Sequence, residues 1–213
     1  MSETASRFLT AESSVHQLLS QPSTLSFDGT SEEEHRSWRK TFRRTLIKNL
    51  GPKPEPVPQE VEILEHTKMD GYIREKIIFN PDSFSSIPAY VLIPDKASLR
   101  NKCPAVLCSH GHGMGKDPLV GLKEDYQKQF AVELALNGFI TISPDWRCFG
   151  ERRDRDEWVR RSSRDGCNVA YFAFGYFGYQ LLQLNICDAQ WCLDYLQSRV
   201  DVDKKRIGCM GCS

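Results

Sequence analysis

Apolar residues follow two different spacings along the chain, and the change falls near residue 100. Before it, short apolar runs typical of strands occupy residues 61–66, 72–79 and 87–93. Asp70-Gly71 separates the first two runs and predicts a β-hairpin, while Asn80-Pro81-Asp82-Ser83 predicts a turn before the third. This part of the chain therefore predicts three antiparallel strands.

After residue 100 the pattern becomes that of buried strands alternating with helices. Short runs typical of strands buried on both faces occupy residues 105–108, 139–142 and 207–210. Apolar residues at helical spacing predict a helix over 123–137 that buries Tyr126, Phe130 and Leu134, and a second helix over 180–198. This order predicts an α/β fold, a doubly wound parallel sheet with right-handed crossovers.

The first 58 residues predict a separate helical appendage. Residues 1–30 are rich in Ser and Thr and favour a tail or linker, with a short helix over about 8–19. Ser31 and Glu34 form a capping-box pattern that starts a helix, and Gly51 is suited to end it. Prolines at positions 52, 54, 56 and 58 favour an extended linker, although such a run could also be a PxxP ligand. We predict an appendage over 1–58 and a main domain over 59–213.

Charge and composition exclude some classes of partner. Twenty-eight basic residues balance 28 acidic ones, so no net charge attracts nucleic acid or an anionic membrane. The basic run over 36–48 is therefore interpreted as a solvated helix face. No apolar run reaches the roughly 18 residues that span a bilayer, and residues 1–28 lack a secretory pattern. These features predict a cytoplasmic protein whose eight cysteines are reduced thiols.

The last predicted strand is followed by Gly211-Cys212-Ser213, which matches the start of a G-x-S-x-G nucleophile elbow. In that turn a serine projects from the junction of a strand and a helix. Acyl transfer by a serine also requires a general base, an acid that orients the base, and hydrogen-bond donors for the oxyanion. Ser213 is the candidate nucleophile.

A glycine-rich loop, His110-Gly111-His112-Gly113, directly follows a predicted buried strand. Such a turn can aim a backbone N–H into a pocket, which makes Gly111 and His112 candidates for an oxyanion hole. The alternative is a tight loop whose glycines only permit positive φ. We expect the His110 side chain to brace this loop.

Two other interpretations of the cysteines and histidines fit less well. Cys103, Cys108, His110 and His112 suggest a zinc site, but their spacing matches no zinc finger, and Cys108 lies in an apolar strand. Cys209-x-x-Cys212 resembles a redox motif, but it spans a strand and the elbow rather than a helix start. The sequence therefore predicts no metal site.

Asp145, Trp146 and Arg147 follow the predicted strand over 139–142. Loops at the carboxyl ends of parallel strands line the crevice in which ligands bind, so these residues are pocket candidates. An internal ion pair between Asp145 and an arginine is the alternative. The aromatic residues over 171–179 could pack in the core, or form a pocket wall or subunit contact.

Taken in order, these motifs resemble the α/β-hydrolases of the acetyl xylan esterase and dienelactone hydrolase kind. The resemblance covers about residues 60–213. It rests on the loop at 110–113, on Asp145-Trp146-Arg147-x-x-Gly150, and on Val202-Asp203-x-x-Arg206-Ile207-Gly208 leading into Gly211-Cys212-Ser213. The segments 70–77 and 88–94 are similar to the first strands of the same group. One departure is Cys148, because the related loop often has glycine there.

The resemblance implies a serine esterase with an α/β-hydrolase fold, of which residues 59–213 are the part ending at the nucleophile. Ser213 would attack the ester carbonyl, and backbone N–H groups of the residue after Ser213 and of the Gly111-His112 segment would hold the oxyanion. The acid and the histidine would come later in the chain. The substrate would be a small-molecule ester, with no cofactor and no metal, and a homo-oligomer stays open.

Two expectations follow from a chain that stops at residue 213. It should have no esterase activity alone, and its last strand, central in this fold, should be an unpaired and aggregation-prone edge. Two alternative functions share the fold: a non-catalytic binding or scaffold module, and a peptidase.

Overall fold

The computed structural model of the chain describes residues 10–154 and 166–212. The chain divides into two compact units, Met1–Asn49 and Leu50–Ser213. The proline-rich segment belongs to the second unit, where Pro56 forms a β-bridge with Asp82 and the Gln59 side chain donates to the Trp191 carbonyl. The proline-rich segment therefore packs against the rest of the second unit.

The first unit contains two helices, α1 (Ala11–Leu19) and α2 (Glu32–Leu50), the second of which ends at the boundary. The predicted capping box begins α2: the Ser31 hydroxyl accepts from the Glu34 N–H at 3.2 Å, and the Glu34 carboxylate accepts from the Ser31 N–H at 2.9 Å. Gly51 follows with φ of +78°, as predicted for a residue that ends a helix.

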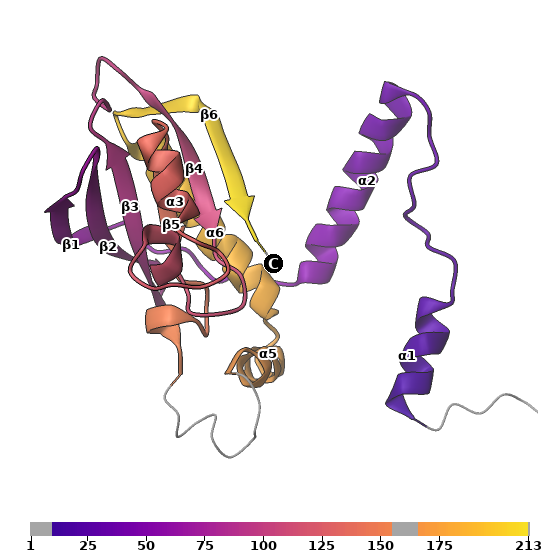
Figure 1. Cartoon of the computed structure of the whole chain (residues 1–213). Helices are drawn as coiled ribbons and strands as arrows, with labels where there is room; N and C mark the ends of the chain where they lie inside the picture. The colour runs from indigo at the N-terminus through magenta and orange to yellow at the C-terminus, as the bar shows by residue number, and fades with distance from the viewer. Residues whose placement is uncertain (1–9, 155–165, 213) are drawn as a thin grey trace, which may run out of the picture. The chain divides into compact units, whose positions relative to one another are not determined.

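The second unit is built on one six-stranded sheet (Figure 1). Its strands lie in the order β1-β2-β3-β5-β4-β6, in which β1, β2, β3 and β5 pair antiparallel while β4 is parallel to both β5 and β6. This confirms the predicted antiparallel strands that lead into a parallel sheet. The strand bounds are β1 Val61–Lys68, β2 Tyr72–Asp82, β3 Ser85–Pro94, β4 Cys103–Ser109, β5 Ile140–Pro144 and β6 Val202–Gly211.

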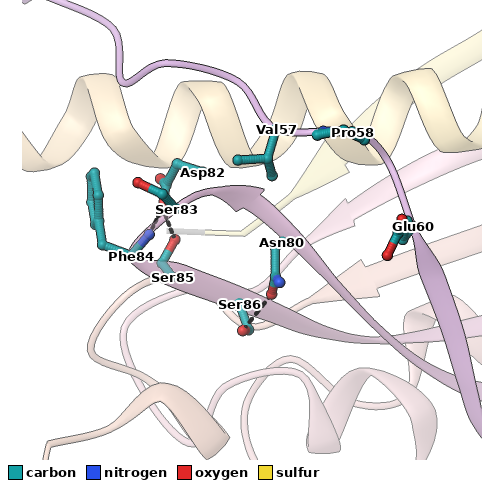
Figure 2. Close-up of a pocket in the computed structure, with 9 residues that line it drawn as sticks. All are labelled: Val57, Pro58, Glu60, Asn80, Asp82, Ser83, Phe84, Ser85 and Ser86. Carbon is teal, nitrogen blue, oxygen red and sulfur yellow. Dashed lines mark hydrogen bonds between the residues drawn. The ribbon is translucent and has the colours of Figure 1, made fainter.

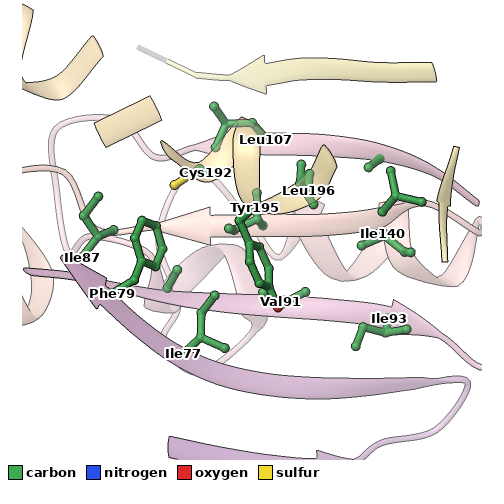
Figure 3. Close-up of a cluster of buried hydrophobic side chains, with 14 of the residues drawn as sticks. Ile77, Phe79, Ile87, Val91, Ile93, Leu107, Ile140, Cys192, Tyr195 and Leu196 are labelled. Carbon is green, nitrogen blue, oxygen red and sulfur yellow. The ribbon is translucent and has the colours of Figure 1, made fainter. Parts of the chain in front are cut away.

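Side chains alternate between the two faces along each strand, so both faces of the sheet carry apolar residues, and helices cover both. Val91 of β3 packs in a core with Tyr195 and Leu196 of α6 (Leu181–Ser198), as Figure 3 shows. The next residue, Leu92, packs in a second core with Ala131 of α3 (Phe130–Leu136). The remaining elements are the 3-10 turns η1 (Asp117–Val120) and η2 (Gly150–Arg152) and the helix α5 (Gly166–Tyr176).

The helix predicted over 123–137 is shorter than expected, which corrects that prediction. Only Phe130–Leu136 is helical, and Tyr126, predicted to be buried, is 54% exposed. The Asp125 carboxylate accepts hydrogen bonds from both the backbone and the side chain of Gln127, and Lys128 has φ of +43°. These local contacts hold the preceding residues in turns and delay the start of the helix.

Most aromatic residues of the predicted cluster over 171–179 lie outside the core. Within α5 only Ala170 is buried, whereas Tyr171 and Phe172 are more than half exposed. Core packing is therefore not the role of these two rings. Among the helices that the structure describes, none combines the length and apolar character needed to cross a membrane.

Candidate functional site

A pocket of about 430 Å³ lies where the chain leaves β4 and β5. Because these strands are parallel neighbours, the loops that follow them meet at the same edge of the sheet. The pocket thus brings together four residues predicted from the sequence, His110, Gly111, His112 and Trp146. The other lining residues are Ser109, Phe149 and, from α6, Leu182, Asn185, Ile186 and Ala189.

His110 cross-links the two loops. The residue is only 5% exposed, and its Nε2 accepts a hydrogen bond from the Trp146 backbone N–H at 3.0 Å. Because Nε2 is an acceptor, the proton lies on Nδ1, which donates to the Gly111 carbonyl at 2.7 Å. Burial lowers the pKa of His110 and keeps the imidazole neutral. Both ring nitrogens are therefore used within the loops.

Replacing His110 with glutamine should flatten the pH dependence of stability. The folded pKa of His110 is depressed by burial, so the unfolded chain binds the proton more readily. The wild type should lose stability as the pH falls below about 6.5, the pKa of an unperturbed histidine. Urea unfolding at pH 7.5, 6.5 and 5.5 measures the effect, which for one proton cannot exceed about 1.4 kcal/mol per pH unit. Equal pH dependence in the two proteins would contradict a neutral, buried His110.

The two candidate oxyanion residues make different contacts. The Gly111 N–H donates to the Gln127 side-chain oxygen at 2.6 Å, so it binds an oxyanion only if Gln127 turns away. The His112 ring packs edge-on against Phe149, with centroids 5.0 Å apart, and its carbonyl accepts from the Tyr126 hydroxyl at 3.4 Å. Gln127 has no motif that would have identified it from the sequence.

The end of β6 lies beside this pocket. Gly211 pairs with Ser109, and a side chain at position 211 would place its Cβ only 3.0 Å from the Ser109 Cβ, so glycine permits the close approach. The Ser109 hydroxyl in turn accepts from the Trp146 indole N–H at 2.8 Å. Ser213, two residues beyond Gly211, lies outside the described residues.

Asp145 does not line the pocket but forms a buried ion pair. Its carboxylate accepts from the Lys116 backbone N–H at 2.8 Å, from the Lys116 ammonium at 2.6 Å and from the Glu151 N–H at 2.9 Å. The Lys116 side chain is fully buried and also pairs with the Glu151 carboxylate. An internal pair of Asp145 with an arginine was one expectation, and the cation on its carboxylate is instead a lysine.

Arg147 is also held inside the protein, away from the pocket lining. Its guanidinium donates to Asp82 at 2.8 Å and to both carboxylate oxygens of Asp188 at 2.8 and 3.1 Å. Arg152 adds a further bond to Asp188 at 2.7 Å. The Arg147 backbone N–H donates to the Asn185 side chain at 3.2 Å, and Asn185 does line the pocket. The backbone of Arg147, rather than its guanidinium, therefore holds a residue of the pocket wall.

Cys148 has a left-handed backbone, with φ of +75°. Glycine adopts this conformation without steric cost, which explains why glycine suits this position in a related loop. Burial raises the pKa of the Cys148 thiol to about 12 and that of Cys108 likewise. In residues 10–154 and 166–212, no group of three or more His, Cys, Asp or Glu side chains could hold a metal ion.

Comparison with known proteins gives relatives that carry the names of hydrolases and esterases. A protein of Bacillus subtilis (strain 168), YtaP, named as a hydrolase, is 32% identical over 177 residues, which are 80% of this chain and 55% of that protein. The chain thus spans about half the length of this curated relative.

Two solved structures share the fold. A Bacteroides fragilis protein described as an acetyl xylan esterase is 25% identical with a TM-score of 0.82, and the match covers 97% of this chain and 55% of that one. Acetyl xylan esterase 1 from Thermoanaerobacterium matches with a TM-score of 0.51 over 80% of this chain and 55% of that one. At 17% identity, the second match shows the fold alone.

The family model covers the whole sequence, residues 1–213. Together with the sheet order and the position of the loops after β4 and β5, this confirms the α/β-hydrolase fold and the resemblance to the acetyl xylan esterase group. The chain belongs to the Abhydrolase family.

Proposed function

We propose that the protein is a carboxylic-ester hydrolase, similar to an acetyl esterase, which acts through an acyl-enzyme on Ser213. The observation that carries the proposal is the pairing of Gly211 with Ser109, a residue that lines the pocket, because Ser213 follows Gly211 by two positions in the sequence. Membership of a hydrolase family and a likeness to a protein described as an acetyl xylan esterase support the reaction class. A pocket of about 430 Å³ suits a small ester group.

In this mechanism the Ser213 hydroxyl oxygen attacks the ester carbonyl carbon, and the hydroxyl proton passes to a general base. The tetrahedral intermediate carries negative charge on the former carbonyl oxygen, which backbone N–H groups stabilise. One donor is proposed from the residue after Ser213 and another from the Gly111-His112 segment. The intermediate then expels the alcohol, protonated by the base, and water hydrolyses the acyl-enzyme to the free acid.

The general base is proposed to lie beyond residue 213. His110 is the histidine most deeply placed in the pocket lining, but its ring nitrogens bind the Gly111 carbonyl and the Trp146 N–H. Using it as a base would break the link between the two loops. In α/β-hydrolases the nucleophile comes first along the chain, then the acid, then the histidine. This order agrees with a position after Ser213 for both the acid and the basic histidine.

The test is hydrolysis of 4-nitrophenyl acetate by three proteins: this 213-residue chain, the same chain continued to the length of its relatives, and the continued chain carrying Ser213→Ala. We expect turnover by the continued chain only, because it alone would hold both the nucleophile and the base. Serine-dependent turnover by the 213-residue chain would contradict the position of the base. Undiminished turnover by the Ser213→Ala protein would contradict the role of Ser213.

A further inference from the structure

The first unit has no hydrophobic core of its own. None of residues 10–49, the described part of this unit, is buried. Its large apolar side chains are 37–76% exposed: Val15, Leu18, Leu19, Phe27, Phe42, Leu46 and Ile47. A segment of about 40 residues usually needs a disulfide, a metal ion or association with another surface to be stable.

Two of these three remedies find no support in the first unit. Its sequence contains no cysteine, since the first cysteine of the chain is Cys103. Among residues 10–49, no group of three His, Cys, Asp or Glu side chains could hold a metal ion. Association with another surface is the remedy that remains, and α2 carries the features that define this surface.

α2 carries an apolar stripe, which we define as Trp38, Phe42 and Leu46. These residues are four positions apart and therefore lie along one side of the helix. The Trp38 and Phe42 rings stack with centroids 5.1 Å apart, and Phe27 lies against Trp38 with centroids 5.2 Å apart. The Trp38 indole N–H donates to the Leu25 carbonyl at 2.8 Å, which orients the ring. The stripe is thus ordered, yet Phe42 and Leu46 remain 37% and 45% exposed.

Charge is separated along α2. The acidic residues of this helix all lie in its first turn, at Glu32, Glu33 and Glu34. Residues 35–49 contain no acidic residue and six basic ones, namely Arg36, Arg39, Lys40, Arg43, Arg44 and Lys48. Arg36 pairs with Glu32 at 2.5 Å, and within the described part of the chain the other five cations make no ion pair. The start of the helix is therefore negative and the rest is positive.

This separation favours one direction when two copies of α2 pack stripe against stripe. In a parallel pair the basic segments of both helices would lie side by side and repel each other. In an antiparallel pair the acidic first turn of each helix lies beside the Arg44–Lys48 end of the other, and two-fold symmetry repeats the contact. With 3.6 residues per turn, five of the six cations are turned by about 100° or more from Phe42, so they stay in solvent.

The segment that joins α2 to the second unit is ordered. Lys53 donates to the Gln190 side chain at 3.3 Å. Further along, Val57 and Pro58 line a pocket together with residues 82–86 at the tip of the β2–β3 hairpin, as Figure 2 shows. Because this segment is already fixed to the second unit, association of two copies does not have to order it, which lowers the entropy cost.

We propose that the apolar stripe of α2 is a dimer interface, and that it packs antiparallel against the same stripe of a second copy of the chain. The opposite charges at the two ends of α2 set the direction of the pair. Covering Phe42 and Leu46 supplies the apolar burial that the first unit lacks. The interface is independent of ester hydrolysis, because all its residues belong to α2.

Sedimentation velocity of the 213-residue chain in about 0.1 M NaCl tests the interface. We expect the wild type to be a dimer at micromolar concentration. Leu46→Asp should raise the dimer dissociation constant at least about a hundredfold, because a carboxylate would be buried in an apolar contact. The matched control is Leu99→Asp, at a leucine of the second unit that is 68% exposed, and it should stay dimeric. Circular dichroism verifies that each variant keeps its helices.

Two charge-reversed proteins test the direction of the pair. One carries Glu32→Lys and Glu33→Lys, and the other carries Arg44→Glu and Lys48→Glu, while Glu34 is kept because it caps the helix. Each protein alone should be monomeric, because both ends of its α2 then carry charge of the same sign. An equimolar mixture should form a dimer, since each negative end then meets a positive end.

The control for charge is Arg100→Glu with Lys102→Glu, which makes the same change in net charge at two exposed residues of the second unit and should stay dimeric. A monomeric wild type, or self-association that Leu46→Asp leaves unchanged, overturns the proposal. A mixture of the charge-reversed proteins that stays monomeric overturns the antiparallel pairing. A monomeric wild type that co-sediments with vesicles of phosphatidylcholine and phosphatidylglycerol would assign the stripe to an anionic membrane instead.

Discussion

Replacing Arg147 with methionine is expected to lower the free energy of unfolding by about 3–5 kcal/mol. The guanidinium contacts Asp82 and Asp188, whose side chains are both fully buried. Methionine fills much of the volume, but among the described residues it leaves Asp82 without a cation and Asp188 with Arg152 alone. The cost is that of buried charge without a partner, which exceeds the value of the ion pair itself.

Urea unfolding of the wild type and the variant at pH 7 measures this loss. The matched control is Arg206→Met, because Arg206 pairs with Asp203 at 2.6 Å, but 59% and 31% of the two side chains are exposed. Exposed pairs contribute about 0–1 kcal/mol, so the control should be close to the wild type. Losses of similar size in both variants would contradict the structural importance of burial at Arg147.

The second large effect is expected from Gly150→Ala, with a loss of at least about 3 kcal/mol. Gly150 has φ of +55°, and a Cβ added there would overlap the Asp145 carboxylate. The Asp145 carboxylate is buried and pairs with the buried Lys116 ammonium, so displacing the carboxylate would separate this ion pair. Strain of about 1–2 kcal/mol from the left-handed backbone adds to this cost.

Gly178→Ala separates the two contributions. Gly178 has φ of +81°, but among the residues that the structure describes no atom outside its chain neighbours lies within 4 Å of the added Cβ. This variant should therefore show only the backbone strain of about 1–2 kcal/mol. The difference between the two losses in urea unfolding reports the contact with Asp145. If the two variants lose equal stability, the close packing of Gly150 against Asp145 is not what constrains this loop.

Much of the fold could be predicted because its signals are local. The capping box of Ser31 and Glu34, the hairpin at Gly71 and the continuous apolar runs of β4 and β5 each depend on neighbouring residues. The helix predicted over 123–137 was too long. Apolar spacing does not show that the Asp125 carboxylate accepts a hydrogen bond from the Gln127 backbone N–H, which holds this segment in a turn.

The candidate site was predictable only where strand ends mark it. His110 and Trp146 each follow a buried strand, and parallel pairing brings such residues together. Lys116 and Gln127 could not have been found in this way. Lys116 binds Asp145 29 residues away, and Gln127 binds Gly111 16 residues away, so neither contact leaves a pattern in the local sequence. Leu182 and Asn185 were missed because the helical period identified only the residues of α6 that face the core.

The strand order also constrains the order of folding. Strands β1 and β2 form one hairpin and β2 and β3 form the next, and each hairpin closes only a short loop. The pairing of β4 with β6 joins Cys103 to Val202 and Ser109 to Gly211, about a hundred residues apart, and contacts of such high contact order form slowly. Since the pocket beside His110 takes one wall from β4 and another from α6, it is completed only when that long loop closes. A nascent chain can therefore complete the antiparallel strands β1, β2 and β3 well before it completes the pocket beside His110.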